Sequence, residues 1–241
     1  MLLAIHQPDH LPYLGFFHKM ARADVFVILE GVDYKKNNFQ NRNRVWTPNG
    51  VAWATVPVLH KGLDSKKIGD IRTVETEPWR KKYRMLLEQN YGRHPGFGAA
   101  MSVVDRALED GGDSLARINT IMIKGFAELL GIRTPIVMDA DLETSGSKSE
   151  LLVSVCRAVG ADSYLSGAGG RDYLDESVFA EAGIAVLYQD FHHPVYPQKG
   201  PTEFVPYLSV FDLICNRPDD AGEILIGGSA PVCETVTELH S

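Results

Sequence analysis

The sequence predicts an α/β fold, with a mainly parallel, doubly wound sheet, an edge hairpin and a helical insertion. Short apolar runs typical of buried strands alternate with helical patterns over residues 1–33 and again over 134–191. Between them, helical periodicity dominates from Pro78 to Leu130. We therefore expect one α/β domain over residues 1–228, in which 78–130 form the insertion, followed by a C-terminal tail over 229–241.

Local patterns define the individual elements. Residues 1–7 are expected to form a buried strand, which a proline-broken turn and a short helix follow. Residues 24–32 are expected to form the next strand, so the three elements make a right-handed βαβ unit. The turn-forming sequence "TPNG" separates two strand-like runs and predicts an antiparallel hairpin at the edge of the main sheet. Later strands are expected over 134–142, 161–167 and 184–191, with helices over 147–160 and 175–183.

Composition restricts the class of protein. The chain has 241 residues, of which 44% are hydrophobic, and its formal charge of −7 gives no electrostatic reason to approach nucleic acid or an anionic membrane. No window approaches the ~20 apolar residues of a membrane span, and the N-terminal apolar run is too short for a signal peptide. Three distant cysteines, Cys156, Cys215 and Cys233, include no CxxC pair. We expect a cytoplasmic protein with reduced thiols and no membrane partner.

The loops after the strands hold most of the polar residues. In a doubly wound sheet these loops line the ligand crevice. After the first strand come His6, Gln7, Asp9, His10 and Tyr13, with prolines that restrict the backbone. Those prolines also disfavour a helical His6 and His10 metal pair, so no metal site is predicted. The alternative is a proline-shaped turn with exposed histidines.

A basic, amide-rich segment follows the second strand. Its Asn41, Arg42 and Arg44 suit an anionic, hydroxyl-rich ligand, because arginine presents a planar fork and asparagine both donates and accepts. A solvated basic loop is the alternative.

Three further segments complete the predicted crevice. In "SGSKSELL", Lys148 and Ser149 precede a helix and would hold an anion, although Ser147 or Ser149 serving only as a helix cap explains the pattern equally well. The glycine-rich segment "YLSGAGGRDY" supplies Ser166, Gly167, Gly169, Gly170, Arg171, Asp172 and Tyr173. The last strand ends in Asp190, His192, His193 and Tyr196, which an ordinary turn would also accommodate.

Several familiar motifs are absent. The chain has no GxxxxGK[ST] loop, no GxGxxG with a following acidic residue, no GxSxG elbow and no HExxH. A nicotinamide cofactor and the usual hydrolase or metalloprotease chemistries therefore lack their signals, and the cofactor stays unknown.

The motifs "IHQPDHLPYLGFF", "ADVFVILEGVDYKKNNFQNRNRV", "GSKSELLVSVCRAVGADSYLSGAGGRDYLD" and "GIAVLYQDFHHPVYPQ" resemble the WbqC-like protein family. The resemblance implies a role in gene clusters for surface polysaccharides such as O-antigen or for specialised metabolites, and a suggested activity as a glycine transferase. The family usually has an Asp-Asp or Asp-x-x-Gln sequence after its second strand, where this chain has Glu30 and Asp33. A weaker likeness is to nucleotidylyltransferases, but "YLGF" stands in place of their HxGH.

The leading hypothesis is an enzyme that transfers a glycyl, aminoacyl or other acyl group to an amine or hydroxyl of a sugar-like small molecule. The donor would be an acyl carrier, an aminoacyl-tRNA or an adenylate. One of His6, His10, His192 and His193, with Asp190 available to orient an imidazole, would act as the base, and arginines would bind carboxylate or phosphate. The alternatives are a nucleotidyl-transferring or ATP-using ligase-like enzyme and a non-catalytic binding or scaffold protein.

Overall fold

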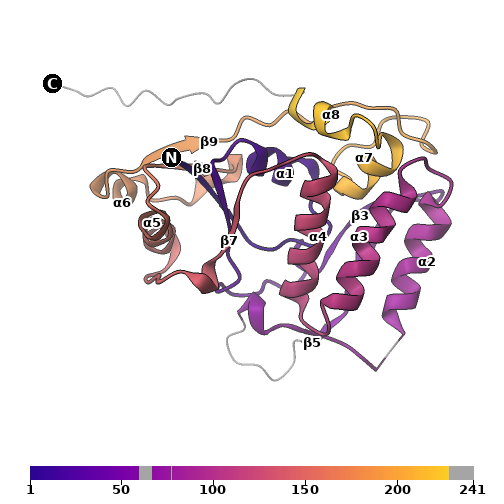
Figure 1. Ribbon diagram of the computed structural model, residues 1–241, viewed down its shortest axis with the longest axis horizontal. Helices are drawn as coiled ribbons and strands as arrows, with labels where there is room; N and C mark the ends of the chain where they lie inside the picture. Colours follow the sequence, from indigo (N-terminus) through magenta and orange to yellow (C-terminus); the bar gives the residue numbers. More distant parts are fainter. Residues whose placement is uncertain (60–66, 77, 228–241) are drawn as a thin grey trace.

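A five-stranded parallel sheet forms the centre of the computed structural model, which describes residues 1–59, 67–76 and 78–227 (Figure 1). The strand order is β7-β2-β1-β8-β9, so the first strand lies in the middle. All four ladders are parallel. The strands are β1 (Leu2–His6), β2 (Val25–Ile28), β7 (Ile136–Met138), β8 (Ser163–Ser166) and β9 (Ala185–Tyr188).

Helices cover both faces of this sheet, which confirms the predicted fold class. Successive side chains of a strand point to opposite faces. Accordingly, Ala4 packs into one apolar cluster, whereas Leu3 and Ile5 pack into another. Figure 1 shows α5 and α6 on one side of the sheet and α2, α3 and α4 on the other. The helices are α1 (Leu14–Ala21), α2 (Trp79–Tyr91), α3 (Phe97–Asp110), α4 (Leu115–Leu129), α5 (Lys148–Val159), α6 (Glu176–Glu181), α7 (Val210–Asn216) and α8 (Ala221–Gly227).

The helical middle of the chain forms α2, α3 and α4, as its periodicity predicts. Each buries an apolar face in the larger cluster, and the Ser114 hydroxyl caps α4 by accepting the Arg117 N–H at 3.3 Å. The division into a domain, an insertion and a tail stays a prediction. Both the tail over 229–241 and Cys233 lie outside the described residues.

The start of α5 differs from the predicted cap. Ser147 occupies the N-cap position, but its side chain makes no capping hydrogen bond, and the Ser149 hydroxyl instead accepts the backbone N–H of Asp175 at 2.9 Å. Ser149 thus ties α5 to the loop after β8 and does not cap its own helix. The other end follows the expected pattern, because Gly160 adopts the left-handed conformation with φ of 73°.

The predicted hairpin forms, but not at the edge of the main sheet. β3 (Arg42–Thr47) and β4 (Gly50–Thr55) pair only with each other, and β5 (Val58–Leu59) and β6 (Arg72–Thr73) make a second small sheet. The outer edge of β3 is occupied in another way: Arg44 O accepts the Ser209 N–H at 2.9 Å, and the Trp46 N–H donates to the Tyr91 hydroxyl at 2.8 Å. These bonds satisfy the backbone groups that a neighbouring strand would otherwise pair with.

The carboxyl ends of all five strands meet at one edge of the sheet. The connection from β1 to β2 runs through α1 on one face, whereas the connection from β8 to β9 runs through α6 on the other. The winding therefore reverses beside β1, and the crevice at such a reversal is where open α/β sheets bind ligands. No helix within the described ranges is long and apolar enough to cross a membrane.

Candidate functional site

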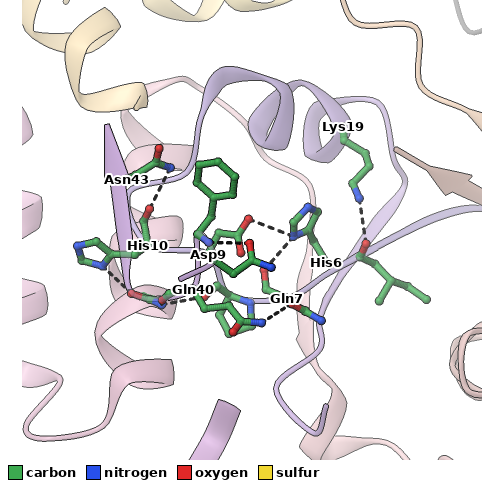
Figure 2. Close-up of polar contacts among 12 residues, drawn as sticks. His6, Gln7, Asp9, His10, Lys19, Gln40 and Asn43 are labelled. Carbon is green, nitrogen blue, oxygen red and sulfur yellow. Dashed lines mark hydrogen bonds and ion pairs between the residues drawn. The ribbon is translucent and has the colours of Figure 1, made fainter. Parts of the chain in front are cut away.

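His6 and Asp9 face each other at the carboxyl end of the central strand (Figure 2). His6 is the last residue of β1, and its Nδ1 lies 3.0 Å from Gln7 O and 3.8 Å from Asp9 Oδ2. Since a carbonyl oxygen only accepts, Nδ1 carries the hydrogen, and Nε2 keeps a free lone pair. The side chains retain 28% and 14% exposure, so the pair is recessed but accessible. Gln7 is held beside it, where its Oε1 accepts from Gln40 Nε2.

A buried lysine from α1 completes this group. Lys19 is 4% exposed, and its ammonium donates to Ile5 O at 3.0 Å, immediately before His6. Burial lowers the pKa of Lys19 to about 8, although the Asp9 charge opposes the shift. Lys19 therefore places a positive charge beneath the loop that follows β1.

Burial shifts the pKa values of His6 and Asp9 in opposite directions. Burial, assisted by the Lys19 charge, lowers the pKa of His6 to about 3, so this imidazole is neutral at physiological pH. Burial raises the pKa of Asp9 to about 7, although Lys19 acts in the opposite direction. A carboxyl group that titrates near neutral pH, beside a neutral imidazole, suits general acid–base chemistry.

Removing the Lys19 charge should shift both neighbouring pKa values upward. In Lys19→Met, His6 loses a repelling cation and Asp9 loses an attracting one, so the pKa of each group rises. NMR titration of the imidazole and carboxyl signals measures both. Arg22→Met is the matched control near the end of the same helix, because Arg22 lowers the pKa of His18. The electrostatic coupling is refuted if Lys19→Met leaves the His6 and Asp9 curves in place.

His10 supports the loop from beneath and does not reach the crevice. It is fully buried, with Nδ1 2.8 Å from Asn119 Oδ1 and Nε2 2.7 Å from the Tyr83 hydroxyl. Asn119 in turn donates to Pro8 O and Gln40 O, both at 2.7 Å. Both ring nitrogens of His10 are bonded to protein partners, so His10 holds the loop after β1 in place and is not free to act as a base.

Asn119→Ala should therefore loosen the candidate site as well as the fold. The change removes the buried partner of His10 Nδ1, Pro8 O and Gln40 O, which costs roughly 2–4 kcal/mol of unfolding free energy. Urea denaturation measures that loss, and hydrogen exchange should accelerate in the backbone around Pro8 and Gln40. Gln89→Ala, which removes an exposed amide on α2, provides the control. A loss no larger than that of the control would contradict the supporting role.

Tyr13 links the His6 and Asp9 pair to a group formed by Arg44, His193 and Tyr207. The charges of Asp9 and Tyr207 both act on the phenol of Tyr13, whose pKa is raised chiefly by burial. Tyr207 lies beside His193, with 5.2 Å between ring centroids, and its ring is 5.9 Å from Arg44 Cζ. Tyr13, Tyr207, His193 and Arg44 are therefore successive neighbours, beginning beside Asp9.

Tyr196 and His192 lie apart from the His6 and Asp9 pair. Tyr196 is buried and donates to Asp212 Oδ2 at 2.9 Å, so its hydroxyl is used inside the protein. His192 is 72% exposed and lies 3.5 Å from Asp190 Oδ1, also at the surface. Such exposed pairs contribute little, and no described contact joins this one to His6.

Residues of the amide-rich segment serve mainly to shape the hairpin. Asn41 is buried and donates to Val56 O at 2.8 Å. Arg42 lies over the Trp53 ring at 4.5 Å and donates to Asn37 O. Asn43, from the same amide-rich segment, donates to His10 O and Leu11 O and so fixes the loop after β1.

The loop after β8 also lies at the carboxyl edge, but it is mostly solvent-facing. Ser166 is buried and donates to Gly167 O, and a Cβ atom at Gly170 would meet the Ser166 hydroxyl at 2.0 Å, so a larger residue there would displace the Ser166 side chain. The Arg171 guanidinium lies 4.0 Å above the Tyr188 ring. The remaining exposed or nearly exposed candidates are Gly167, Gly169, Asp172, Tyr173 and Lys148.

The potential metal ligands and the thiols can be located over the described residues. Over the described ranges, no cluster of three or more His, Cys, Asp or Glu residues could hold a metal ion. Cys156 and Cys215 are buried, and burial raises the pKa of Cys215 above its ordinary value.

Lys19 and Tyr207 were not selected from the sequence. Lys19 stands within the apolar run "LGFFHKMA". Charged residues are rarely buried, so a lysine inside an apolar helix could have been recognised from the sequence as unusual. Tyr207 offers no comparable signal, because only the path of the chain after β9 brings it to Arg44 and His193.

These features define an α/β protein with a recessed imidazole and carboxylate pair at the end of its central strand, beside an arginine and several aromatic rings. The chain belongs to the WbqC-like protein family, whose profile matches residues 7–224. It is 32% identical over 225 residues, 92% of this chain and 96% of the relative, to a protein of Mycobacterium tuberculosis (strain ATCC 25618 / H37Rv) named "Uncharacterized protein Rv1507c". No solved structure matches the present chain.

Proposed function

We propose that this protein is a biosynthetic transferase that moves an aminoacyl or other acyl group to an amine or hydroxyl of a sugar-like small molecule. The observation that carries the proposal is the Asp9 carboxyl, whose side chain is 14% exposed and whose pKa is about 7, beside neutral His6. Surface-polysaccharide or specialised-metabolite synthesis in the cytoplasm is the setting that we propose for it.

The chemistry assigns a separate task to each side chain. His6 Nε2 accepts a hydrogen bond from the acceptor and orients it. As the acceptor nitrogen or oxygen forms its new bond to the acyl carbon, its proton passes to ionised Asp9, and the bond from that carbon to the donor's leaving group breaks. Lys19 keeps a useful fraction of Asp9 ionised, because its charge opposes the effect of burial on the Asp9 pKa. Lys19 is a positioning residue in this scheme.

The test is a search for product with defined donors and acceptors. The purified protein is incubated with the N-acetylcysteamine thioesters of glycine and acetate, or with glycyl-tRNA, together with glucosamine, galactosamine or an anionic amino sugar. Mass spectrometry then follows acylated sugar. Product that depends on Asp9 supports the proposal. Product that forms only with ATP and magnesium would support the ligase-like alternative, and binding of sugar with no turnover of any donor would support a scaffold.

A further inference from the structure

Arg44 and His193 carry buried polar atoms that find no partner in the described part of the chain. Arg44 Nε and His193 Nε2 are both buried and unpaired there. None of the ion pairs among the described residues includes Arg44, although the chain has 31 acidic and 24 basic residues. Buried polar groups in proteins are normally hydrogen-bonded, so an unpaired guanidinium beside an unpaired imidazole needs an explanation.

The two groups require different partners. The Arg44 guanidinium only donates and is permanently positive, so an anion is its strongest partner. His193 Nδ1 lies 2.8 Å from Pro194 O and therefore carries the hydrogen, which leaves Nε2 as an acceptor. Burial lowers the pKa of His193, and the charge of Arg44 acts in the same direction, so the ring stays neutral. A ligand that satisfies both has a negative group near a hydroxyl or amino hydrogen.

Tyr207 provides a surface between these two groups. Its ring is close to both His193 and Arg44, and its side chain is 50% exposed. Its φ of 60° is a left-handed backbone conformation that non-glycine residues rarely adopt, and such strain collects at ligand sites. An exposed ring with a phenol hydroxyl, held in this way, suits a hydroxylated ring ligand.

We propose that Arg44, His193 and Tyr207 form a subsite for an anionic sugar. The guanidinium binds the carboxylate of a sugar acid or the phosphate of a sugar phosphate, Nε2 of His193 accepts from a sugar hydroxyl, and Tyr207 covers the ring. This assignment rests on the proposed function, since it specifies the acceptor. It gives His193 a binding task in place of the catalytic one considered from the sequence.

Binding without turnover tests the subsite. Titration calorimetry compares D-glucuronate, D-glucose 6-phosphate and uncharged D-glucose, while 15N NMR follows Arg44 Nε and His193 Nε2 in the unmutated protein. At least one anionic sugar should bind tenfold or more tightly than glucose and move both signals. Arg44→Gln should weaken that binding by about tenfold to a hundredfold, as expected for a lost charge-assisted bond. Arg44→Lys, which keeps the charge but not the fork, should lie between the two.

Arg133→Gln is the control for net charge. Arg133 is exposed and precedes β7, so it lies at the opposite edge of the sheet. Preference for glucuronate identifies a carboxylate and preference for the phosphate ester identifies a phosphate, and either supports the subsite. Equal binding of all three sugars, or anionic-sugar binding that Arg44→Gln leaves unchanged, overturns it. If the anionic sugar binds as described but no donor is ever turned over, the subsite stands and the transferase proposal fails.

Discussion

Asp9→Asn should reduce turnover by roughly 10²–10⁴-fold, the range expected when a general base is removed. Asparagine keeps the size of the side chain but accepts no proton from the acceptor. Substrate binding should change little, because the proposed binding groups are His6 Nε2 and Arg44. In the unmutated protein, kcat should rise with pH through a value near 7, as the Asp9 carboxyl ionises.

The same substitution should make the protein more stable at alkaline pH. Burial raises the folded-state pKa of Asp9 from 3.8 to about 7. A carboxyl with a raised pKa contributes stability that is fully present below about pH 4 and is lost as pH rises through 7. The asparagine side chain of the variant is neutral throughout, so the gain over Asp9 should be on the order of 1–4 kcal/mol at pH 8.

Urea denaturation at pH 4 and pH 8, together with kinetics at saturating donor, measures both effects. Asp33→Asn is the control, because Asp33 is an exposed carboxylate that pairs with Lys67 at the surface. Lower turnover with higher alkaline stability would mark Asp9 as a group kept for function at a cost in stability. Full activity in Asp9→Asn would exclude it as the base, and a large loss of stability at both pH values would indicate a structural role.

The sequence predicts the fold well because hydrophobic burial is a local signal. Leu3 and Ile5 face one side of the sheet and Ala4 the other, so β1 appears as a continuous apolar run. The hairpin was also evident from its turn, but its place was not. The outer edge of β3 bonds to Ser209 and Tyr91, which lie more than 40 residues away in the chain. Local sequence patterns contain no information about such distant partners.

The site is predictable in its location but less so in its roles. Strand ends and polar loops indicated the carboxyl edge of the sheet, and His6 lies at that edge as the last residue of β1. His10, only four residues later, turns inward because Asn119 and Tyr83 saturate its ring. The two histidines look alike in sequence. Their difference comes from α2 and α4, which approach the loop only in the folded chain.

Asp212 shows how the structure holds the arginine side of the crevice. Its carboxylate accepts from the Tyr91 hydroxyl, the Tyr196 hydroxyl and Gln198 Nε2, each at 2.9 Å. The Tyr91 hydroxyl also accepts the Trp46 N–H of β3. One side chain therefore joins α7, α2, the segment after β9 and the strand that carries Arg44. Burial raises the pKa of Asp212, while these three donors act in the opposite direction.

Asp212→Ala should lower the unfolding free energy by roughly 3–5 kcal/mol, because it removes the carboxylate that accepts three hydrogen bonds and leaves the buried Tyr196 hydroxyl without its acceptor. Asp212→Asn should cost less, since Oδ1 still accepts while the amide group faces a donor. The control is Asp190→Ala, an exposed carboxylate whose removal should change stability by under about 0.5 kcal/mol. Urea denaturation measures all three variants. A loss below about 1 kcal/mol in Asp212→Ala would show that water or neighbouring groups replace the carboxylate. A large loss, with weaker anionic-sugar binding in the milder Asp212→Asn, would connect this network to the position of Arg44.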